Sequence, residues 1–211
     1  MPQKSVRLII FLVAFCCACN SPYVPKPRGY FNIDFPERKY QLFEQPGYPY
    51  SFEYPVYGRI VKDSSFFDEN NPYWINIDFP MFNGRIYLSY KEIGGTSVYK
   101  VKTAEGYKDS TVQNKFDALR DEAYRMTYKH SLKATSIEDS AFITSNGIGG
   151  IYFNVGGNAA TAKQFYVTDT SKHFLRGALY FDAAPNEDSL SVVNRFLQED
   201  MKHLISTLKW K

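Results

Sequence analysis

Few side chains in this sequence of 211 residues combine the type and spacing that catalysis or metal binding requires. The histidines are His130, His173 and His203, and none belongs to an HxH, HxxxH or HExxH pattern. No Gly-x-Ser-x-Gly motif marks a serine nucleophile. Adjacent acids such as Glu138 and Asp139 could act as glycosidase carboxylates only if acids from different elements met across a cleft. The sequence therefore predicts no catalytic residue, no metal site and no cofactor, and a hydrolase would need groups that only the fold brings together.

Two glycine-rich stretches, residues 147–150 and 156–158, invite comparison with phosphate-binding loops. A dinucleotide-binding fingerprint needs a third glycine at a fixed offset and a helix after it, but Tyr152 stands at that offset and strand-like sequence follows. We therefore interpret both stretches as hairpin turns.

The three cysteines, Cys16, Cys17 and Cys19, lie at the end of an apolar run over residues 8–18. Two basic residues and no acid precede this run, which is the order of a secretory signal. The run is too short for a transmembrane helix, which needs about 20 apolar residues. Because no cysteine follows residue 19, the rest of the chain can hold neither a disulfide nor a cysteine-ligated metal.

This arrangement resembles bacterial lipoprotein signals, in which small residues precede a cysteine that is diacylated and becomes the first residue of the mature chain. Cys19 fits best, because Ala18 precedes it and Asn20 and Ser21 follow. The resemblance implies a signal peptide over residues 1–18 and a membrane anchor through a diacylglyceryl group on Cys19. An ordinary signal peptide cut near Ala18, which would leave a free thiol, is the alternative.

Removal of residues 1–18 from the 211 would leave 193 residues, a length that fits a single domain with its own core. The formal net charge would fall from +3 to +1 with the two basic residues of the signal. A nearly neutral chain lacks the concentrated basic surface that nucleic acids require, so no nucleic-acid partner is predicted. The 17 Tyr of the sequence and the 15 Phe that follow residue 18 instead supply flat rings for core and surface.

A proline-rich segment would begin the mature chain. Residues 20–29 contain Pro22, Pro25 and Pro27, a spacing that favours the extended polyproline II conformation. At ~3.1 Å per residue, ten such residues span about 30 Å. We therefore expect residues 19–38 to form a lipid-anchored tether and residues 39–211 to form a single domain.

The elements of that domain follow from periodicity. Between residues 30 and 73 aromatic residues alternate with prolines, so strands there should be short or at a sheet edge. Residues 74–79 and 85–90 alternate with period two around Asn83 and Gly84, which predicts a hairpin with a tight turn. Four strand-like runs separated by turn residues, expected to form an antiparallel meander, are residues 141–145, 150–155, 164–168 and 174–181.

Two helices are predicted. Residues 110–113 read as a capping box, and apolar residues at helical spacing then extend from Phe116 to Met126, which indicates a helix over about residues 112–130. A C-terminal amphipathic helix should begin near Asn186 and carry an apolar stripe to Leu208. Because such a stripe needs an apolar partner, the predicted fold class is α+β, an antiparallel β-sheet with a mid-chain helix and a C-terminal amphipathic helix packed on it.

Five sequence motifs stand out along the mature chain. They are YVPKPRGYF at residues 23–31, NIDFP at residues 76–80, HFLRGALYF at residues 173–181, PNEDSL at residues 185–190 and LKW at residues 208–210. With these motifs the mature chain resembles the gliding motility lipoprotein GldD family of the Bacteroidota. The last strands and the terminal helix are also similar to the α+β sandwich of PsbP and Mog1, which are binding rather than catalytic proteins.

The GldD resemblance implies a non-catalytic envelope lipoprotein that is required for gliding motility and assembles or stabilises the gliding and type IX secretion machinery. Its partners would be other proteins of that machinery, and the family supplies no catalytic residues. Outward-facing lipoproteins of this group tend to carry acids soon after the cysteine, and residues 20–30 contain none. We therefore expect an outer-membrane lipoprotein that faces the periplasm.

Exposed aromatic side chains leave a second function open. Trp74 and Tyr87 belong to the predicted hairpin, and such rings stack on sugars as well as on partner proteins, although core packing accounts for many of them. The alternative is therefore a polysaccharide- or peptidoglycan-binding module of the cell envelope. The candidate partner-binding residues are Tyr23, Pro25, Lys26, Pro27, Arg28, Gly29, Tyr30, Trp74 and Tyr87.

Overall fold

The computed structural model describes residues 33–62 and 71–211 of the chain. Cys19, the signal and the front of the tether lie outside these residues, so their assigned roles remain predictions. No helix within the described ranges has both the length and the apolar character needed to cross a bilayer.

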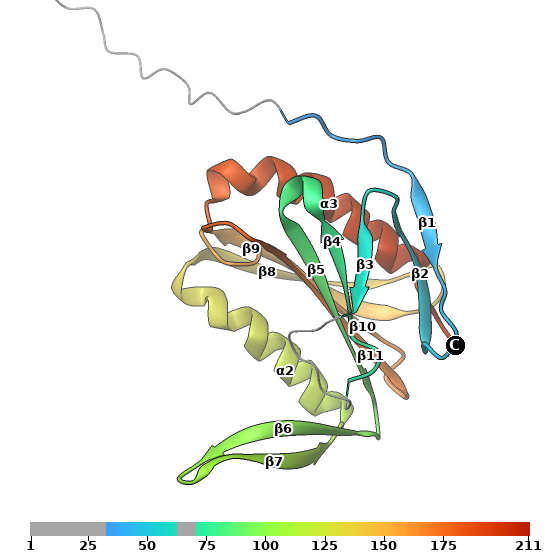
Figure 1. The fold of residues 1–211 in the computed structure, drawn as a ribbon, viewed down its shortest axis with the longest axis vertical. Coiled ribbons are helices and arrows are strands. Elements are labelled where there is room, and N and C mark those ends of the chain that lie inside the picture. Colours follow the sequence, from blue (N-terminus) through green and yellow to red (C-terminus); the bar gives the residue numbers. More distant parts are fainter. Residues whose placement is uncertain (1–32, 63–70) are drawn as a thin grey trace, which may run out of the picture. The chain divides into compact units, whose positions relative to one another are not determined.

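A seven-stranded antiparallel sheet is the centre of the fold (Figure 1). In spatial order its strands are β3 (Arg59–Lys62), β4 (Ile75–Phe79), β5 (Gly84–Glu92), β11 (His173–Phe181), β10 (Lys163–Thr168), β9 (Gly149–Gly157) and β8 (Ala134–Ile143). Strands β4 and β5 are the predicted hairpin, and β8 to β11 are the predicted meander. The α+β class with an antiparallel sheet is confirmed.

The turn between β4 and β5 is longer than predicted, although the hairpin itself is confirmed. A 3-10 turn, η1 (Pro80–Phe82), follows β4, and Asn83 then has a φ of 46° in the left-handed region. Gly84 is already the first residue of β5 and has no positive φ. An added Cβ there would lie 3.1 Å from the ring of Phe181, so a larger residue would require that ring to shift slightly.

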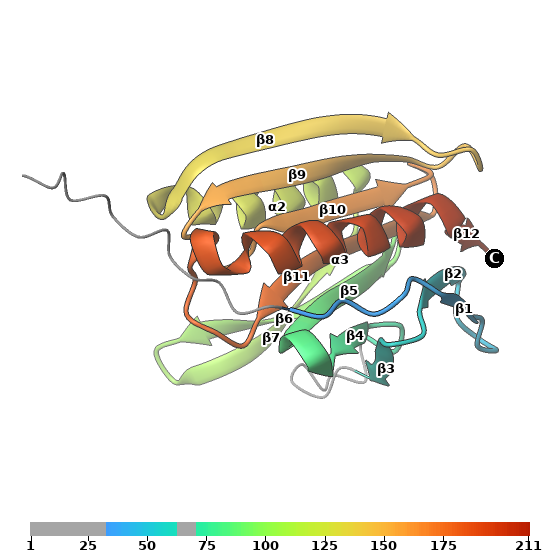
Figure 2. The same cartoon turned by 90° about the horizontal axis from the view of Figure 1, so that it is seen from above.

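One face of the sheet is covered by α3 (Glu187–Thr207) and by a small sheet of β1 (Tyr40–Phe43), β2 (Tyr50–Pro55) and β12 (Lys209–Trp210) (Figure 2). The Asn186 side chain accepts a hydrogen bond from Ser189 N at 3.2 Å and caps the helix where the sequence predicts its start. The predicted stripe is confirmed, since Leu197, Met201 and Leu204 are at most 1% exposed and share one core with the sheet.

The opposite face of the sheet is only partly covered, by α2 (Phe116–Tyr128). Leu119 and Ala123 of this helix pack on Phe153, Tyr166 and Phe174 of β9, β10 and β11. A short 3-10 helix, η2 (Lys129–Leu132), follows α2. The hairpin of β6 (Thr96–Thr103) and β7 (Gly106–Gln113) lies next to the first turn of α2 (Figure 1). Strands β4 and β5 therefore keep part of this face open.

The predicted start of the mid-chain helix is wrong. Residues 110–113, interpreted as a capping box, belong to β7 and pair with residues 96–99 of β6. The helix begins at Phe116, and its N-cap residue Lys115 makes no side-chain cap hydrogen bond. Backbone groups paired across a hairpin are no longer available to a helix, so the pairing overrides the local capping pattern. The helix ends at Tyr128, two residues before its predicted end at residue 130.

Exposure explains why strand content is missed in this region. The hairpin β6–β7 is exposed along nearly its whole length, and apolar-polar alternation marks a strand only where one face is buried. Strand β8 likewise begins at Ala134, well before the predicted residue 141, and most of its side chains are exposed.

Candidate functional site

An open groove of about 1210 Å³ lies on the face of the seven-stranded sheet opposite α3; we call it the sheet groove. Its floor is formed by β4, β5 and β11, and its walls by α2 and β6. Strand alternation positions the floor, because Arg85, Tyr87 and Ser89 of β5 line the groove while Ile86 and Leu88 enter the core under α3. The same two-residue period that builds the core therefore builds the groove.

Two ion pairs fix the shape of the sheet groove. Arg85 donates to both carboxylate oxygens of Asp78, with Nε–Oδ1 at 2.5 Å and Nη2–Oδ2 at 2.8 Å, and these hydrogen bonds raise the pKa of Arg85. Lys91 Nζ donates to Glu122 Oε2 of α2 at 2.9 Å and to Tyr99 Oη of β6 at 2.7 Å. Lys91 therefore ties both walls to the floor.

Aromatic side chains line the groove between these pairs. Trp74 and Tyr87, the two candidate residues within the described ranges, both lie there. The rings of Tyr87 and Tyr180 meet edge to face with centroids 5.6 Å apart, and the Arg85 guanidinium is 5.6 Å from the Tyr87 centroid. Trp74 Nε1 donates to the Tyr90 carbonyl at 2.8 Å. These rings are held in place but only partly buried, as in surfaces that bind sugars or proteins.

Arg176 of β11 adds a cation to the groove floor. Its Nη2 donates to Oε1 of Gln164, a side chain that is 0% exposed. Within the described ranges, no carboxylate lies at ion-pair distance from Arg176, since Asp78 is held by Arg85 and Glu122 by Lys91. Burial lowers the pKa of Arg176, although the nearby Tyr180 and Glu122 act against the shift.

The three histidines lie in separate places. Burial and the charge of Arg176 lower the pKa of His130, which is therefore neutral at pH 7. His173 Nδ1 lies 2.7 Å from the Tyr90 hydroxyl, and His203 is bonded to β2 on the α3 side. In the part of the chain that the structure describes, no group of three His, Cys, Asp or Glu side chains could hold a metal ion.

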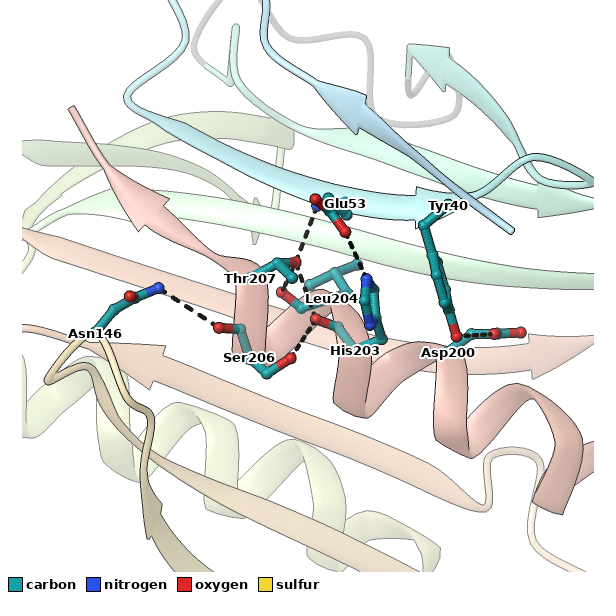
Figure 3. Close-up of polar contacts among 8 residues, drawn as sticks. All are labelled: Tyr40, Glu53, Asn146, Asp200, His203, Leu204, Ser206 and Thr207. Atoms are coloured by element: carbon teal, nitrogen blue, oxygen red, sulfur yellow. Dashed lines mark hydrogen bonds and ion pairs between the residues drawn. The ribbon is translucent and has the colours of Figure 1, made fainter. Parts of the chain in front are cut away.

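A second polar cluster fastens the first residues of the folded unit to α3. We call it the anchor-side junction and define it by Phe35, Arg38, Tyr40, Asp200 and His203. Asp200, 1% exposed, accepts hydrogen bonds from the hydroxyls of Tyr40 at 3.0 Å and Tyr57 at 2.6 Å (Figure 3 shows the first). Burial raises the pKa of Asp200 although these donors act against the shift.

Ring stacking completes the junction. The Tyr40 ring lies flat on the His203 ring, with centroids 3.5 Å apart and an angle of 13° between planes (Figure 3). His203 Nε2 lies 2.7 Å from Glu53 Oε2 of β2, and the Phe35 ring lies 4.4 Å from the ring of Phe196. Residues at the front of the fold are therefore packed directly on its longest helix.

The end of α3 is held as well. Thr207 Oγ1 accepts a hydrogen bond from Glu53 N at 3.0 Å, and Asn146 Nδ2 donates to the Ser206 carbonyl at 3.5 Å (Figure 3). Asn146 Nδ2 also donates to the Leu208 carbonyl at 3.0 Å. These amide donors satisfy carbonyls that a helix end leaves free. The turn between β8 and β9 and the strand β2 thus both fix the position of α3.

The structure brings together some predicted residues and adds others. The candidates Tyr23, Pro25, Lys26, Pro27, Arg28, Gly29 and Tyr30 lie outside the described residues, as does Cys19. Arg176 and Tyr180 also line the groove but were not among the predicted residues. Arg176 could have been identified as a charged residue inside the apolar run 174–181. The sequence did not point to Tyr99 or Glu122 as groove residues, because its periodicity does not show that β6 and α2 lie beside β5.

Comparisons with known proteins match the chain to a family model and show similarity to solved structures. A family model described as gliding motility lipoprotein GldD matches residues 20–210. No curated protein sequence matches the chain. The solution structure of cyanobacterial PsbP from Synechocystis sp. is similar at 14% identity and a TM-score of 0.44, covering 88% of this chain and 99% of that one.

Proposed function

Since the chain belongs to the gliding motility lipoprotein GldD family, we propose that it serves gliding motility as a non-catalytic anchored component that assembles or stabilises the gliding and type IX secretion machinery. Membership in a lipoprotein family associates the chain with the cell envelope. The match begins at residue 20, directly after the proposed lipid-bearing Cys19. The proposed location is the outer membrane, on its periplasmic face, in a member of the Bacteroidota.

The observation that carries the binding role is the sheet groove. Lys91 holds α2 and β6 against the floor, so the groove is formed before any partner arrives. A preformed site costs less ordering on binding than a flexible one. Trp74 and Tyr87 are the proposed contacts in the groove, and residues 23–30 are the proposed contacts of the tether. Other gliding and secretion proteins of the envelope are the proposed partners.

Anchoring is tested by Cys19→Ala in gliding cells. Without the thiol no diacylglyceryl group can be attached, so the protein should leave the membrane fraction and gliding should be lost. Membrane fractionation, mass spectrometry of the mature N-terminus and colony spreading are the measurements. Cys17→Ala is the matched control and should keep both anchor and motility. Full motility with a soluble, correctly exported Cys19→Ala protein would contradict the anchoring proposal.

A second candidate function is the binding of an envelope polysaccharide or peptidoglycan. It is favoured by the partly exposed rings of Trp74, Tyr87 and Tyr180 beside fixed charged groups in the sheet groove. Sugar rings stack on such aromatic faces, while charged side chains bond their hydroxyl groups. Loss of glycan binding on Trp74→Ala or Tyr87→Ala would favour this function, and binding to envelope proteins alone would favour the first.

A further inference from the structure

Arg176 is a largely buried cation in the floor of the sheet groove, and no carboxylate of the described residues lies at ion-pair distance from it. Arg85 and Lys91 each have a carboxylate partner, at 2.5 and 2.9 Å. Arg176 instead donates to the neutral oxygen of Gln164 and interacts with Tyr180. Glu122, the partner of Lys91, acts on Arg176 only from farther away. A desolvated cation without an anionic partner is unfavourable, and an incoming anion removes that penalty. At Arg176 the floor therefore favours a ligand that carries negative charge.

The form of the groove indicates what carries that charge. Strands β4, β5 and β11 are hydrogen-bonded on both sides within the sheet, so the floor offers no free strand edge to an extended peptide. A docked amphipathic helix would need an apolar groove, but two ion pairs cross this one. A folded partner protein can still contact Trp74 and Tyr87 from outside, but the ligand that fits the charged floor is a sugar chain, because the Tyr87 and Tyr180 rings offer stacking faces next to charged hydrogen-bonding groups.

We propose that the sheet groove binds an acidic oligosaccharide and that Arg176 receives one of its carboxylates. A volume of about 1210 Å³ exceeds the 300–1,000 Å³ typical of small-molecule pockets, so the groove accommodates several sugar rings. The guanidinium is suited to a carboxylate because its planar donors match both oxygens. Tyr180 lies four positions further along the same strand and face, where the neighbouring sugar ring would stack.

The test measures binding of defined glycans to the complete mature lipoprotein in detergent, by calorimetry. The probes are soluble peptidoglycan strands, oligogalacturonate and, as the neutral comparison, an oligomer of N-acetylglucosamine. At least one acidic probe should bind, and Arg176→Gln should weaken that binding about tenfold or more, whereas Arg176→Lys should retain part of it. Which acidic probe binds distinguishes a cell-wall ligand from a uronic-acid polysaccharide.

Arg195→Gln is the matched control, since Arg195 is exposed on α3 at the other face of the sheet. It should bind as the unchanged protein does, and thermal unfolding should show that all variants are folded. Equal binding of the neutral oligomer, or no binding of either acidic probe, would overturn the inference. The inference rests on the second candidate function. If no acidic glycan binds but Cys19→Ala still abolishes gliding, the inference fails and the proposed anchoring role stands.

Discussion

Asp169 shows how one side chain closes a turn of the sheet. Its Oδ1 accepts the backbone amides of Ser171 at 3.0 Å and of Lys172 and His173 at 2.8 Å. Burial acts to raise the pKa of Asp169, but these three hydrogen bonds outweigh it and the pKa lies below its ordinary 3.8. The carboxylate therefore stabilises the turn that joins β10 to β11.

Asp169→Asn should lower the free energy of unfolding by about 1–2 kcal/mol at pH 7, because hydrogen bonds to a charged acceptor are stronger than those to a neutral one. A depressed pKa gives stability that is complete above 3.8 and is lost as pH falls through the folded value. The difference between the two proteins should therefore be constant from pH 5 to 7 and shrink below pH 4. Urea unfolding across this range measures it.

The exposed Asp109 on β7 supplies the control, since Asp109→Asn should leave the unfolding free energy within about 0.5 kcal/mol. An Asp169→Asn protein with unchanged stability at pH 7 would show that the turn does not depend on the charge. The sequence predicts a turn at residues 169–171. It does not predict the positive φ of 64° at Thr170, because Thr rarely adopts that conformation without nearby bonds that hold it.

At the scale of elements, the hairpin β6–β7 depends on few contacts with the rest of the fold. Lys91 reaches Tyr99, and the Ser97 hydroxyl donates to Asn114 Oδ1 at 2.6 Å while Asn114 Nδ2 donates to the Glu92 carbonyl at 3.0 Å. An exposed element with little buried apolar area opens locally at low free-energy cost. The hairpin is therefore the part of the groove wall that a single substitution can loosen.

Lys91→Met should increase local opening of the hairpin β6–β7 while the core stays folded. Loss of a partly buried ion pair and a hydrogen bond costs about 1.4 kcal/mol locally, which corresponds to roughly tenfold faster amide hydrogen exchange over residues 96–113. Exchange measured by mass spectrometry tests this, with Lys102→Met on the exposed side of β6 as the control. Exchange that accelerates equally throughout the sheet would mean that Lys91 supports the whole fold instead.

Element prediction from the sequence succeeded where one face is buried. The stripe of α3, the alternation of β4 and β5 and the apolar runs of β10 and β11 all reflect burial in the core, so these elements could be predicted. The start of α2 was wrong because residues 110–113 satisfy two local patterns, and only the pairing with β6 decides between them. Hairpin β6–β7 has no buried face and so left no pattern.

At the scale of the whole folded unit, the groove and the anchor-side junction lie on opposite faces of one sheet. The sequence placed Trp74 and Tyr87 on a candidate binding face, and the structure places both in the groove. It could not reveal Arg176 as their neighbour, because strand order brings β11 beside β5 across more than eighty residues. Contacts of this kind follow from topology, which periodicity does not encode.

This arrangement predicts a sided interaction surface. A photo-crosslinking residue at Lys100, in the groove wall, should capture gliding or type IX secretion proteins in living cells, whereas one at the exposed Lys202 of α3 should not. Mass spectrometry identifies the captured proteins. Equal capture of these proteins from both positions, or none from Lys100 in motile cells, would contradict a partner surface at the groove.

With the proposed lipid anchor on Cys19, a pull on the chain would enter the fold at the anchor-side junction. Strain that arrives along the backbone at Phe35 meets the stack on Phe196 and the buried bonds to Asp200 before it reaches any strand of the central sheet. The load is therefore spread along a helix of 21 residues with its core beneath it. Because the groove lies on the far side of that core, we expect its geometry to stay unchanged when force acts through the proposed Cys19 anchor.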